Sequence, residues 1–316
     1  MDKLNNIKKI IYMAFMRGPL WRRMLVWLLA VIMFVVCFLG LVDMNFLWLF
    51  GKSPGFADIK NPVVSEASEV YSADGVLMGR YYNENRTPVK YEQISPIIIR
   101  TLIATEDERF YYHHGVDFQG LFAAGKDMMK GNARGASTIT QQLAKNLFRV
   151  RTRYSTGLCG HIPGVKLLVM KMKEWIVAEK LEFIYTKEDI LTMYFNTVDF
   201  GSNAFGIKTA ARSYFNTTPD SLNYEQSAIL VGLLKATSTY NPRLNPKNAL
   251  SRRNVVLENL YDHDGIIIND KNATRQQLDS LKSLPLTLRV KHAENGGQNG
   301  IAPYFRQELK KYIKKL

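Results

Sequence analysis

The chain has 316 residues, enough to bury the core of one large domain together with a smaller one. Hydrophobic residues make up 47% of it and the mean hydropathy is -0.14, which excludes a multispan membrane protein. The formal net charge of +14 requires an anionic partner or surface. Because the sequence has no zinc-ligand spacing, RNA-binding aromatic block or arginine-rich arm, it favours a membrane or an anionic substrate over nucleic acid.

Residues 24–42 form an uncharged apolar segment that predicts a membrane-spanning helix. At 1.5 Å per residue such a helix is roughly 28 Å long, close to the hydrocarbon thickness of a bilayer. Basic residues dominate the preceding segment, 1–23, so the positive-inside rule predicts that this segment is cytoplasmic and that the rest of the chain is exported. A cleaved signal peptide is the alternative, but the apolar segment is too long for one and no A-x-A-type cleavage site follows it.

The segment after this helix, 43–68, is predicted to be an irregular juxtamembrane linker. A hairpin is predicted over 70–82, because Asp74-Gly75 is a favoured two-residue turn between strand-forming residues. Ser95-Pro96 predicts a helix start, with serine as the N-cap and proline in the first turn, and this helix brings Glu106 near its end. Its apolar face is predicted to consist of Ile97, Ile98, Leu102 and Ile103.

Residues from about 106 to 260 have helical periodicity almost throughout, so we predict a mainly α fold with one core domain over 69–262. The predicted helices include 166–183, a helix that follows a capping box at Thr186, and 222–234. A C-terminal extension over 263–316 is predicted to hold a helix at 274–282, a strand at 286–290, a glycine-rich break at 296–300 and a final basic helix.

The sequence EDERFYYHHG, residues 106–115, places a carboxylate beside aromatic and histidine residues. Glu106 is a candidate general base, and the aromatic residues 110–112 are expected to form an apolar wall that partly desolvates it. Asp107 and His113 are expected to brace the loop. The simpler interpretation is a solvated helix end, because further charged residues follow Glu106 directly.

The sequence GASTITQQLAKN, residues 135–146, is a small-residue turn that leads into a helix. The first amides of a helix have no partner within it, so this start is a natural binding site for an anion or a hydroxyl group. Gln141 and Lys145 are one turn apart on the same helical face, where Lys145 is a candidate point charge for a phosphate. An N-capped surface helix is the alternative.

Together, these two segments resemble the first two motifs of the peptidoglycan glycosyltransferases (glycosyltransferase family 51), the enzymes that polymerise lipid II into glycan strands. KMKE, residues 171–174, is similar to the third motif, R-K-x-x-E, with Met170 in place of the arginine. The resemblance implies that Glu174 is a second catalytic carboxylate, which polarises the donor or holds a divalent cation, Mg²⁺ or Mn²⁺. The alternative is an ordinary helical pair of Lys171 with Glu174. Lys173 is expected to carry part of the missing positive charge.

Residues 194–215 and 222–246 resemble the fourth and fifth motifs, with Thr237 where the family commonly has proline, so the resemblance extends over about residues 65–260. The basic segment 149–164 is expected either to touch lipid headgroups, with Arg153 as a pyrophosphate contact, or to be a solvated loop. The candidate substrate-binding residues are Arg134, Ser137, Thr138, Gln141, Gln142, Lys145, Arg153, Lys171, Lys173 and Asn196.

The resemblance implies a lysozyme-like fold with a small membrane-proximal lobe, and a single-step, inverting transfer that releases undecaprenyl pyrophosphate. It also implies inhibition by moenomycin, a bacterial inner-membrane location with a periplasmic domain, and a role in cell-wall biogenesis beside other wall-synthesis proteins. The transpeptidase strings S-x-x-K and K-T-G do not occur in the chain. We therefore expect a monofunctional enzyme or the glycosyltransferase portion of a class A penicillin-binding protein.

Two other functions would use the same residues. A lysozyme-like hydrolase or lytic transglycosylase would use Glu106 on finished peptidoglycan, but it needs neither an anchor nor a pyrophosphate-binding set of cations. An inactive cell-wall scaffold is suggested only by the departures at Met170 and Thr237, and both candidate carboxylates are present. The sequence therefore favours the polymerase.

Overall fold

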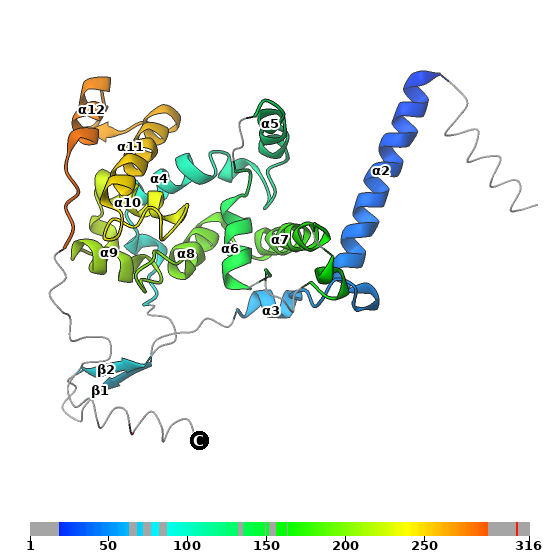
Figure 1. Ribbon diagram of the computed structural model, residues 1–316, viewed down its shortest axis with the longest axis horizontal. Coiled ribbons are helices and arrows are strands. Elements are labelled where there is room, and N and C mark those ends of the chain that lie inside the picture. Colours follow the sequence, from blue (N-terminus) through cyan, green and yellow to red (C-terminus); the bar gives the residue numbers. More distant parts are fainter. Residues whose placement is uncertain are drawn as a thin grey trace, which may run out of the picture. The chain divides into compact units, whose positions relative to one another are not determined.

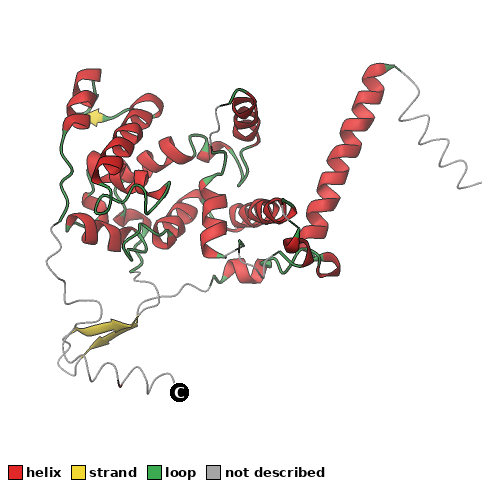
Figure 2. Cartoon of the chain, viewed as in Figure 1, coloured by secondary structure: helices red, strands yellow, loops and turns green. Residues whose placement is uncertain are grey.

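The computed structural model describes residues 19–62, 68–71, 77–81, 87–131, 135–148, 150–151, 156–162 and 164–289, together with position 308 (Figure 1). The chain divides into two compact units: unit 1 consists of residues 1–55 and 149–177, and unit 2 of residues 56–148 and 178–316. Helices dominate the described part of both units, and the strands are few and short (Figure 2). The predicted mainly α class, with one apolar helix near the N-terminus, is confirmed.

Unit 1 begins with the predicted apolar helix, α2 (Leu20–Asp43). It is the one helix in the described part of the chain that is long and apolar enough to cross a membrane. Most of its large apolar side chains are exposed, whereas a core helix of a water-soluble domain would bury one face. These properties fit a helix that is surrounded by lipid.

The segment that follows α2 packs against residues 149–177 of the same unit. Val42 and Phe50 pack against Val169 in a buried apolar cluster. The amide of Cys159 donates a hydrogen bond to the carbonyl of Leu49 (2.8 Å). The first part of the predicted linker is therefore packed structure. The elements that take part are η1 (Phe46–Trp48), η5 (Leu158–His161) and the first part of α7 (Val165–Ile184), inside which the boundary between the units falls.

The centre of unit 2 is a group of three helices that pack on one another: α4 (Pro96–Glu106), α10 (Tyr224–Leu234) and α11 (Pro246–His263). Ser95 caps α4 by accepting a hydrogen bond from the amide of Ile97 (3.3 Å), as predicted. The buried face of α4 differs slightly from the predicted one, because Ile99 is buried with Ile98 and Leu102.

The other helices of unit 2 surround this group. Two predicted helix starts are confirmed, because Thr186 and Thr274 each form a capping box. The bounds are α3 (Phe56–Lys60), η2 (Tyr91–Gln93), η3 (Phe110–Tyr112), α5 (Phe118–Met129), α6 (Ile139–Leu147), α8 (Lys187–Thr197), α9 (Ile207–Phe215), η6 (Pro219–Ser221) and α12 (Arg275–Ser283).

Two short antiparallel hairpins complete the described part of unit 2. The predicted hairpin is present as β1 (Ser68–Tyr71) and β2 (Leu77–Tyr81), and its predicted turn at Asp74-Gly75 lies outside the described residues. A second hairpin, β3 (Ile267–Ile268) with β4 (Lys271–Asn272), was not predicted. Its turn residues, Asn269 and Asp270, both have positive φ angles (51° and 60°), which asparagine and aspartate tolerate better than most residues.

Two predictions about local structure are wrong. Residues 56–60 form α3 where an irregular linker was expected, and the hydroxyl of Tyr185 donates to the carbonyl of Ile59 at its end (3.1 Å). Residues 286–289 do not form the predicted strand; the amide of Arg289 bonds instead to the carbonyl of Tyr214 (2.7 Å). The predicted break at 296–300 and the basic helix after it lie outside the described residues.

Candidate active site

Glu106 is the last residue of α4, and its carboxylate is held by a relay of two side chains. The side-chain amide of Gln142 on α6 donates from Nε2 to Oε2 of Glu106 (2.8 Å). The hydroxyl of Tyr194 on α8 donates to Oε1 of the same glutamine (3.0 Å), which fixes the orientation of its amide. Burial, followed by the charge of Glu106, raises the pKa of Tyr194 well above its usual value, so this hydroxyl stays a donor.

The second oxygen of Glu106 has a different neighbour. Its Oε1 lies 4.0 Å from Nη2 of Arg252 on α11, and the side chain of Glu106 is 18% exposed. The predicted apolar wall is wrong in part, because Phe110 is buried but Tyr111 and Tyr112 are more than half exposed. The described partners of Glu106 are therefore an amide and a guanidinium group.

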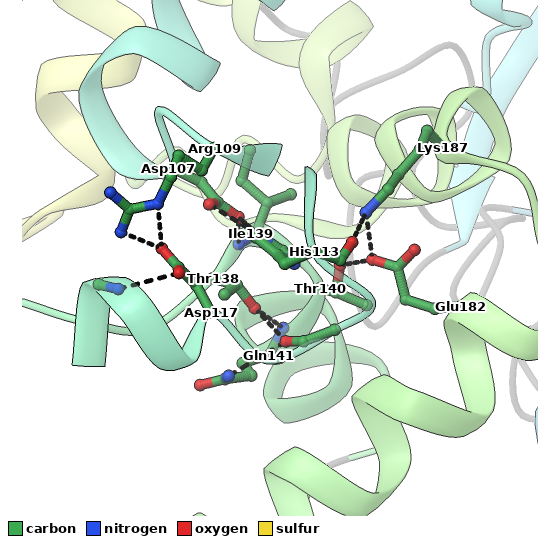
Figure 3. Close-up of polar contacts among 12 residues, drawn as sticks. Asp107, Arg109, His113, Asp117, Thr138, Ile139, Thr140, Gln141, Glu182 and Lys187 are labelled. Atoms are coloured by element: carbon green, nitrogen blue, oxygen red, sulfur yellow. Dashed lines mark hydrogen bonds and ion pairs between the residues drawn. The ribbon is translucent and has the colours of Figure 1, made fainter. Parts of the chain in front are cut away.

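The first two sequence motifs are joined by buried hydrogen bonds, as Figure 3 shows. The carboxylate of Asp107 accepts from Nε2 of His113 (2.9 Å) and from the amide of Ile139 at the start of α6 (2.9 Å). The predicted bracing role of Asp107 and His113 fits these contacts. The carbonyl of Gly115 accepts from Oγ1 of Thr138 (2.7 Å) and Nε2 of Gln141 (3.1 Å).

These bonds change the interpretation of the start of α6. Its first amide, that of Ile139, is taken by Asp107, and the amide of Gln141 donates to Oγ1 of Thr138 (3.2 Å). A carboxylate of the chain itself therefore occupies the predicted anion site. Thr138 and Gln141 are buried, so their side chains brace the two motifs in this structure instead of facing a substrate.

A third layer of contacts, missed by the sequence analysis, supports the same region (Figure 3). Lys187 donates to the carbonyl of His113 (2.7 Å) and to Oε1 of Glu182 (2.8 Å), and lies over the ring of Phe110 (4.4 Å from its centre). Oγ1 of Thr140 also donates to Glu182 (2.6 Å). The residues are far apart in sequence, and only the capping box before Lys187 marked this position.

Glu174 lies in unit 1, on α7, and is almost completely buried. Its Oε2 pairs with Nζ of Lys171 (3.0 Å), as the helical spacing predicts, and its Oε1 pairs with Arg151. Both oxygens thus have a cation of the chain as partner, an arrangement that does not suit a metal ion on this carboxylate. Among the described residues, no group of three or more His, Cys, Asp or Glu side chains could hold a metal ion.

Lys173 does not have the predicted role of a phosphate-binding charge. Its side chain is fully buried, and Nζ donates to the carbonyls of Gly51 (2.6 Å) and Lys52 (2.8 Å). Burial lowers the pKa of Lys173 to about 8, partly offset by the charge of Asp43. This lysine fastens the chain after α2 to α7.

The remaining candidates fall into three groups. Asn196 bonds both ways to the backbone of Val89 (2.9 and 2.8 Å) and braces that loop. Ser137 and Lys145 are half-buried and stay candidates for substrate contact. Gln142 stays a candidate because it donates to the carboxylate of Glu106. Arg134 and Arg153 lie outside the described residues. Arg151, which also belongs to the basic segment 149–164, pairs with Glu174.

Comparisons with known proteins agree on one kind of domain. The family model described as Transglycosylase matches residues 74–261. Penicillin-binding protein 1A of Escherichia coli strain K12 is 40% identical over 232 residues, which cover 73% of this chain and 25% of that protein. The same protein of Haemophilus influenzae is 34% identical over 255 residues, covering 79% and 26%. The chain thus spans about a quarter of the length of these relatives.

A solved structure, that of penicillin-binding protein 1A from Haemophilus influenzae, is also similar. It is 20% identical with a TM-score of 0.41, and the match covers 80% of this chain and 25% of that one.

Proposed function

The chain belongs to the transglycosylase family, and from this premise we propose that it is a peptidoglycan glycosyltransferase that polymerises lipid II. The relatives are penicillin-binding proteins, whose glycosyltransferase portion corresponds to the matched part of this chain. The substrate is thus a lipid-linked disaccharide, and the product is a β-1,4-linked glycan strand.

The observation that carries this proposal is the environment of Glu106. Gln142 holds Oε2, and within the described residues no hydrogen bond occupies Oε1. A general base needs a fixed carboxylate with one oxygen within reach of the proton that it removes. The side chain is also partly exposed, so a sugar hydroxyl can reach it.

In the proposed reaction, Oε1 of Glu106 takes the proton from the 4-hydroxyl of the GlcNAc unit of lipid II. The hydroxyl oxygen forms a bond to C1 of the MurNAc at the lipid end of the growing strand. The bond from C1 to the pyrophosphate oxygen breaks, and its electron pair leaves with undecaprenyl pyrophosphate. Attack opposite the leaving group inverts the configuration at C1, in a single step.

The leaving diphosphate needs positive charge near its oxygens. Lys145 on α6 is our candidate for this charge. Within unit 1, Glu174 holds Lys171 and Arg151 in place, since each of its oxygens pairs with one of these cations. Lys173 is not one of the candidate phosphate-binding cations, because its amine donates to two backbone carbonyls.

A lipid-linked substrate requires an enzyme at the membrane, and α2 supports such a location. We propose that α2 anchors the chain in the bacterial inner membrane, with the N-terminus cytoplasmic and the transglycosylase domain on the periplasmic side. The basic residues before α2 support this orientation.

The test is polymerisation of labelled lipid II by the detergent-solubilised chain, with products separated on a gel. Glu106→Gln keeps the size of the side chain and removes the base, so we expect at least about a hundredfold loss of polymer. Glu108→Gln is the matched control: the same change two positions away, on a side chain that is 56% exposed. It should polymerise as the wild type does.

Two outcomes would contradict the proposal. If Glu106→Gln, correctly folded, polymerised at the rate of the wild type, Glu106 would not be the base. If the wild type left lipid II intact but released soluble fragments from isolated cell walls, the chain would be a hydrolase or lytic transglycosylase.

A further inference from the structure

We infer that Tyr194 is a positioning residue for the base: through Gln142, its hydroxyl fixes the orientation of the carboxylate of Glu106. The inference rests on the proposed function and extends it to a residue that acts through another side chain. The three residues belong to different helices, α8, α6 and α4 (Figure 1). Because α8 packs on α6, the hydroxyl of Tyr194 reaches the amide of Gln142.

The direction of the two hydrogen bonds follows from the chemistry of the groups. An ionised carboxylate only accepts hydrogen bonds, so the nitrogen end of the Gln142 amide must face Glu106 (2.8 Å). The oxygen end, which only accepts, then faces Tyr194, whose hydroxyl must donate (3.0 Å). Burial raises the pKa of Tyr194 well above its usual value, so the hydroxyl keeps this proton. Tyr194 therefore selects the one amide orientation that can hold the base.

The bonding of Tyr194 differs from that of two other tyrosines of unit 2. Tyr214 is fully buried, and its hydroxyl donates to the carbonyl of Phe200 (2.9 Å). The hydroxyl of Tyr185 donates to the carbonyl of Ile59 (3.1 Å). Backbone carbonyls are already held by the fold, so these two bonds brace the structure. The hydroxyl of Tyr194 donates instead to a side chain that holds the proposed base, and so adds order where the backbone alone leaves freedom.

Tyr194 is the fixed end of this chain of hydrogen bonds. Its side chain is completely buried, and its ring packs edge-on against that of Phe195, with the ring centres 5.9 Å apart. Gln142 is half-buried and Glu106 is 18% exposed, so both side chains have room to change rotamer. A general base must be held close to its productive geometry, and the buried ring supplies the rigid point from which the amide and then the carboxylate are held.

Loss of the hydroxyl would leave the amide oxygen of Gln142 without this donor. The amide can then turn, and in the reversed orientation its oxygen faces the carboxylate of Glu106 and repels it. The base would spend only part of its time in the productive orientation. A smaller fraction of competent enzyme lowers kcat, whereas KM changes little, because the hydroxyl of Tyr194 acts on the base and not on the bound substrate.

The first experiment measures kcat and KM for polymerisation of lipid II by the full chain. We expect Tyr194→Phe to lower kcat about tenfold and to leave KM within about twofold of the wild-type value. Tyr214→Phe is the matched control, because it also removes the hydroxyl of a buried tyrosine, but one that bonds to a backbone carbonyl. It should lower Tm to a similar extent, while kcat stays within about twofold of the wild type.

A double-mutant cycle separates positioning from a structural effect. Gln142→Met keeps the length of the side chain and removes the amide, so it should lower kcat at least as much as Tyr194→Phe does. In this background, Tyr194→Phe should lower kcat by less than a further factor of about two, because the side chain through which it acts is already gone. The charges of Arg252 and Lys145 are the same in all these variants, so the change in kcat reports the geometry of the base.

The inference would be overturned if Tyr194→Phe kept the wild-type kcat, if it changed KM alone, or if the two losses multiplied in the double mutant. If Tyr194→Phe does not fold, Gln142→Met takes its place, and a wild-type kcat in that variant overturns the inference equally. A wild type that makes no polymer contradicts the proposed function instead. Crystal structures then test the inference without turnover: the side chains of Gln142 and Glu106 should leave their wild-type positions in Tyr194→Phe, and unchanged positions overturn it.

Discussion

The two candidate carboxylates, Glu106 and Glu174, have opposite kinds of surroundings. Glu174 is buried, and each of its oxygens pairs with a cation of the protein that balances its charge. Glu106 is partly exposed, and only one of its oxygens has a hydrogen bond within the described residues. A carboxylate that must exchange a proton needs the second arrangement, and one that must hold cations in place needs the first.

Motif residues and their partners differ in how well the sequence predicts them. Glu106, Gln142, Lys171 and Glu174 lie in short strings with recognisable spacing, so they were found. Arg252 was missed because its contact with Glu106 depends on the packing of α11 against α4, which no local pattern encodes. For the same reason the sequence could not distinguish a buried structural amine at Lys173 from a binding one.

Lys173 gives the chain a measurable pH dependence of stability. Burial lowers its pKa from 10.5 to about 8, so between these values the unfolded chain binds more protons than the folded one. The free energy of unfolding therefore rises with pH in this range, and the full cost of the buried charge is present below pH 8.

We expect the Tm of the wild type to rise relative to that of Lys173→Met when the pH increases from 7.5 to 9.5. The change should be about 1 kcal/mol after allowance for solvent screening, or roughly 2–4 °C. The other titrating groups are common to both proteins and cancel in the difference. A Tm difference that is constant with pH, measured by scanning fluorimetry in detergent, would show that Lys173 does not titrate in this range.

At the scale of elements, helix starts were predicted well because their signals are local. Ser95 with Pro96, and the capping boxes at Thr186 and Thr274, each act within one turn of the helix that they begin. A strand needs a partner strand, and the alternating segment 286–289 has none among the described residues, so its pattern misled the prediction. Residues 56–60 formed a helix without a strong start signal.

The junction between the segment after α2 and the segment before α7 depends on Gly157, the residue directly before η5. Gly157 has a positive φ (56°), and a Cβ there would lie 2.4–2.7 Å from backbone atoms of Trp48, Leu49 and Gly51. Backbone atoms cannot move aside as a flexible side chain can. The close approach of these two segments therefore requires glycine at this position.

We expect Gly157→Ala to destabilise unit 1 by about 3 kcal/mol or more, because steric overlap adds to backbone strain. Gly164→Ala is the matched control: its φ is also positive (84°), but no described atom lies within 4 Å of the added methyl group. It should cost only about 1 kcal/mol of strain. Hydrogen exchange at the amide of Cys159, which bonds to Leu49, reports the opening of this junction. Equal exchange in the two variants would contradict the proposed packing.

For the molecule as a whole, the proposed anchor α2 and the charge distribution predict one orientation in the membrane. The segment before α2 is strongly basic, and positive segments stay on the cytoplasmic side. We therefore expect unit 2, with Glu106, to lie outside the cytoplasm, where the proposed polymerisation takes place. The orientation is independent of any assay of activity, so it tests the proposed location directly.

The test uses single cysteines in a background that lacks Cys37 and Cys159, the two native thiols. Asp279→Cys places a thiol on the exposed face of α12, and Lys9→Cys places one before the anchor. In intact spheroplasts, a membrane-impermeant maleimide should label the first variant fully and the second only after permeabilisation, because a charged reagent does not cross the bilayer. The reverse pattern would put the domain in the cytoplasm. Lipid II on the periplasmic face of the membrane could not then reach Glu106. The proposal of a periplasmic polymerase would fail even if the purified chain were active.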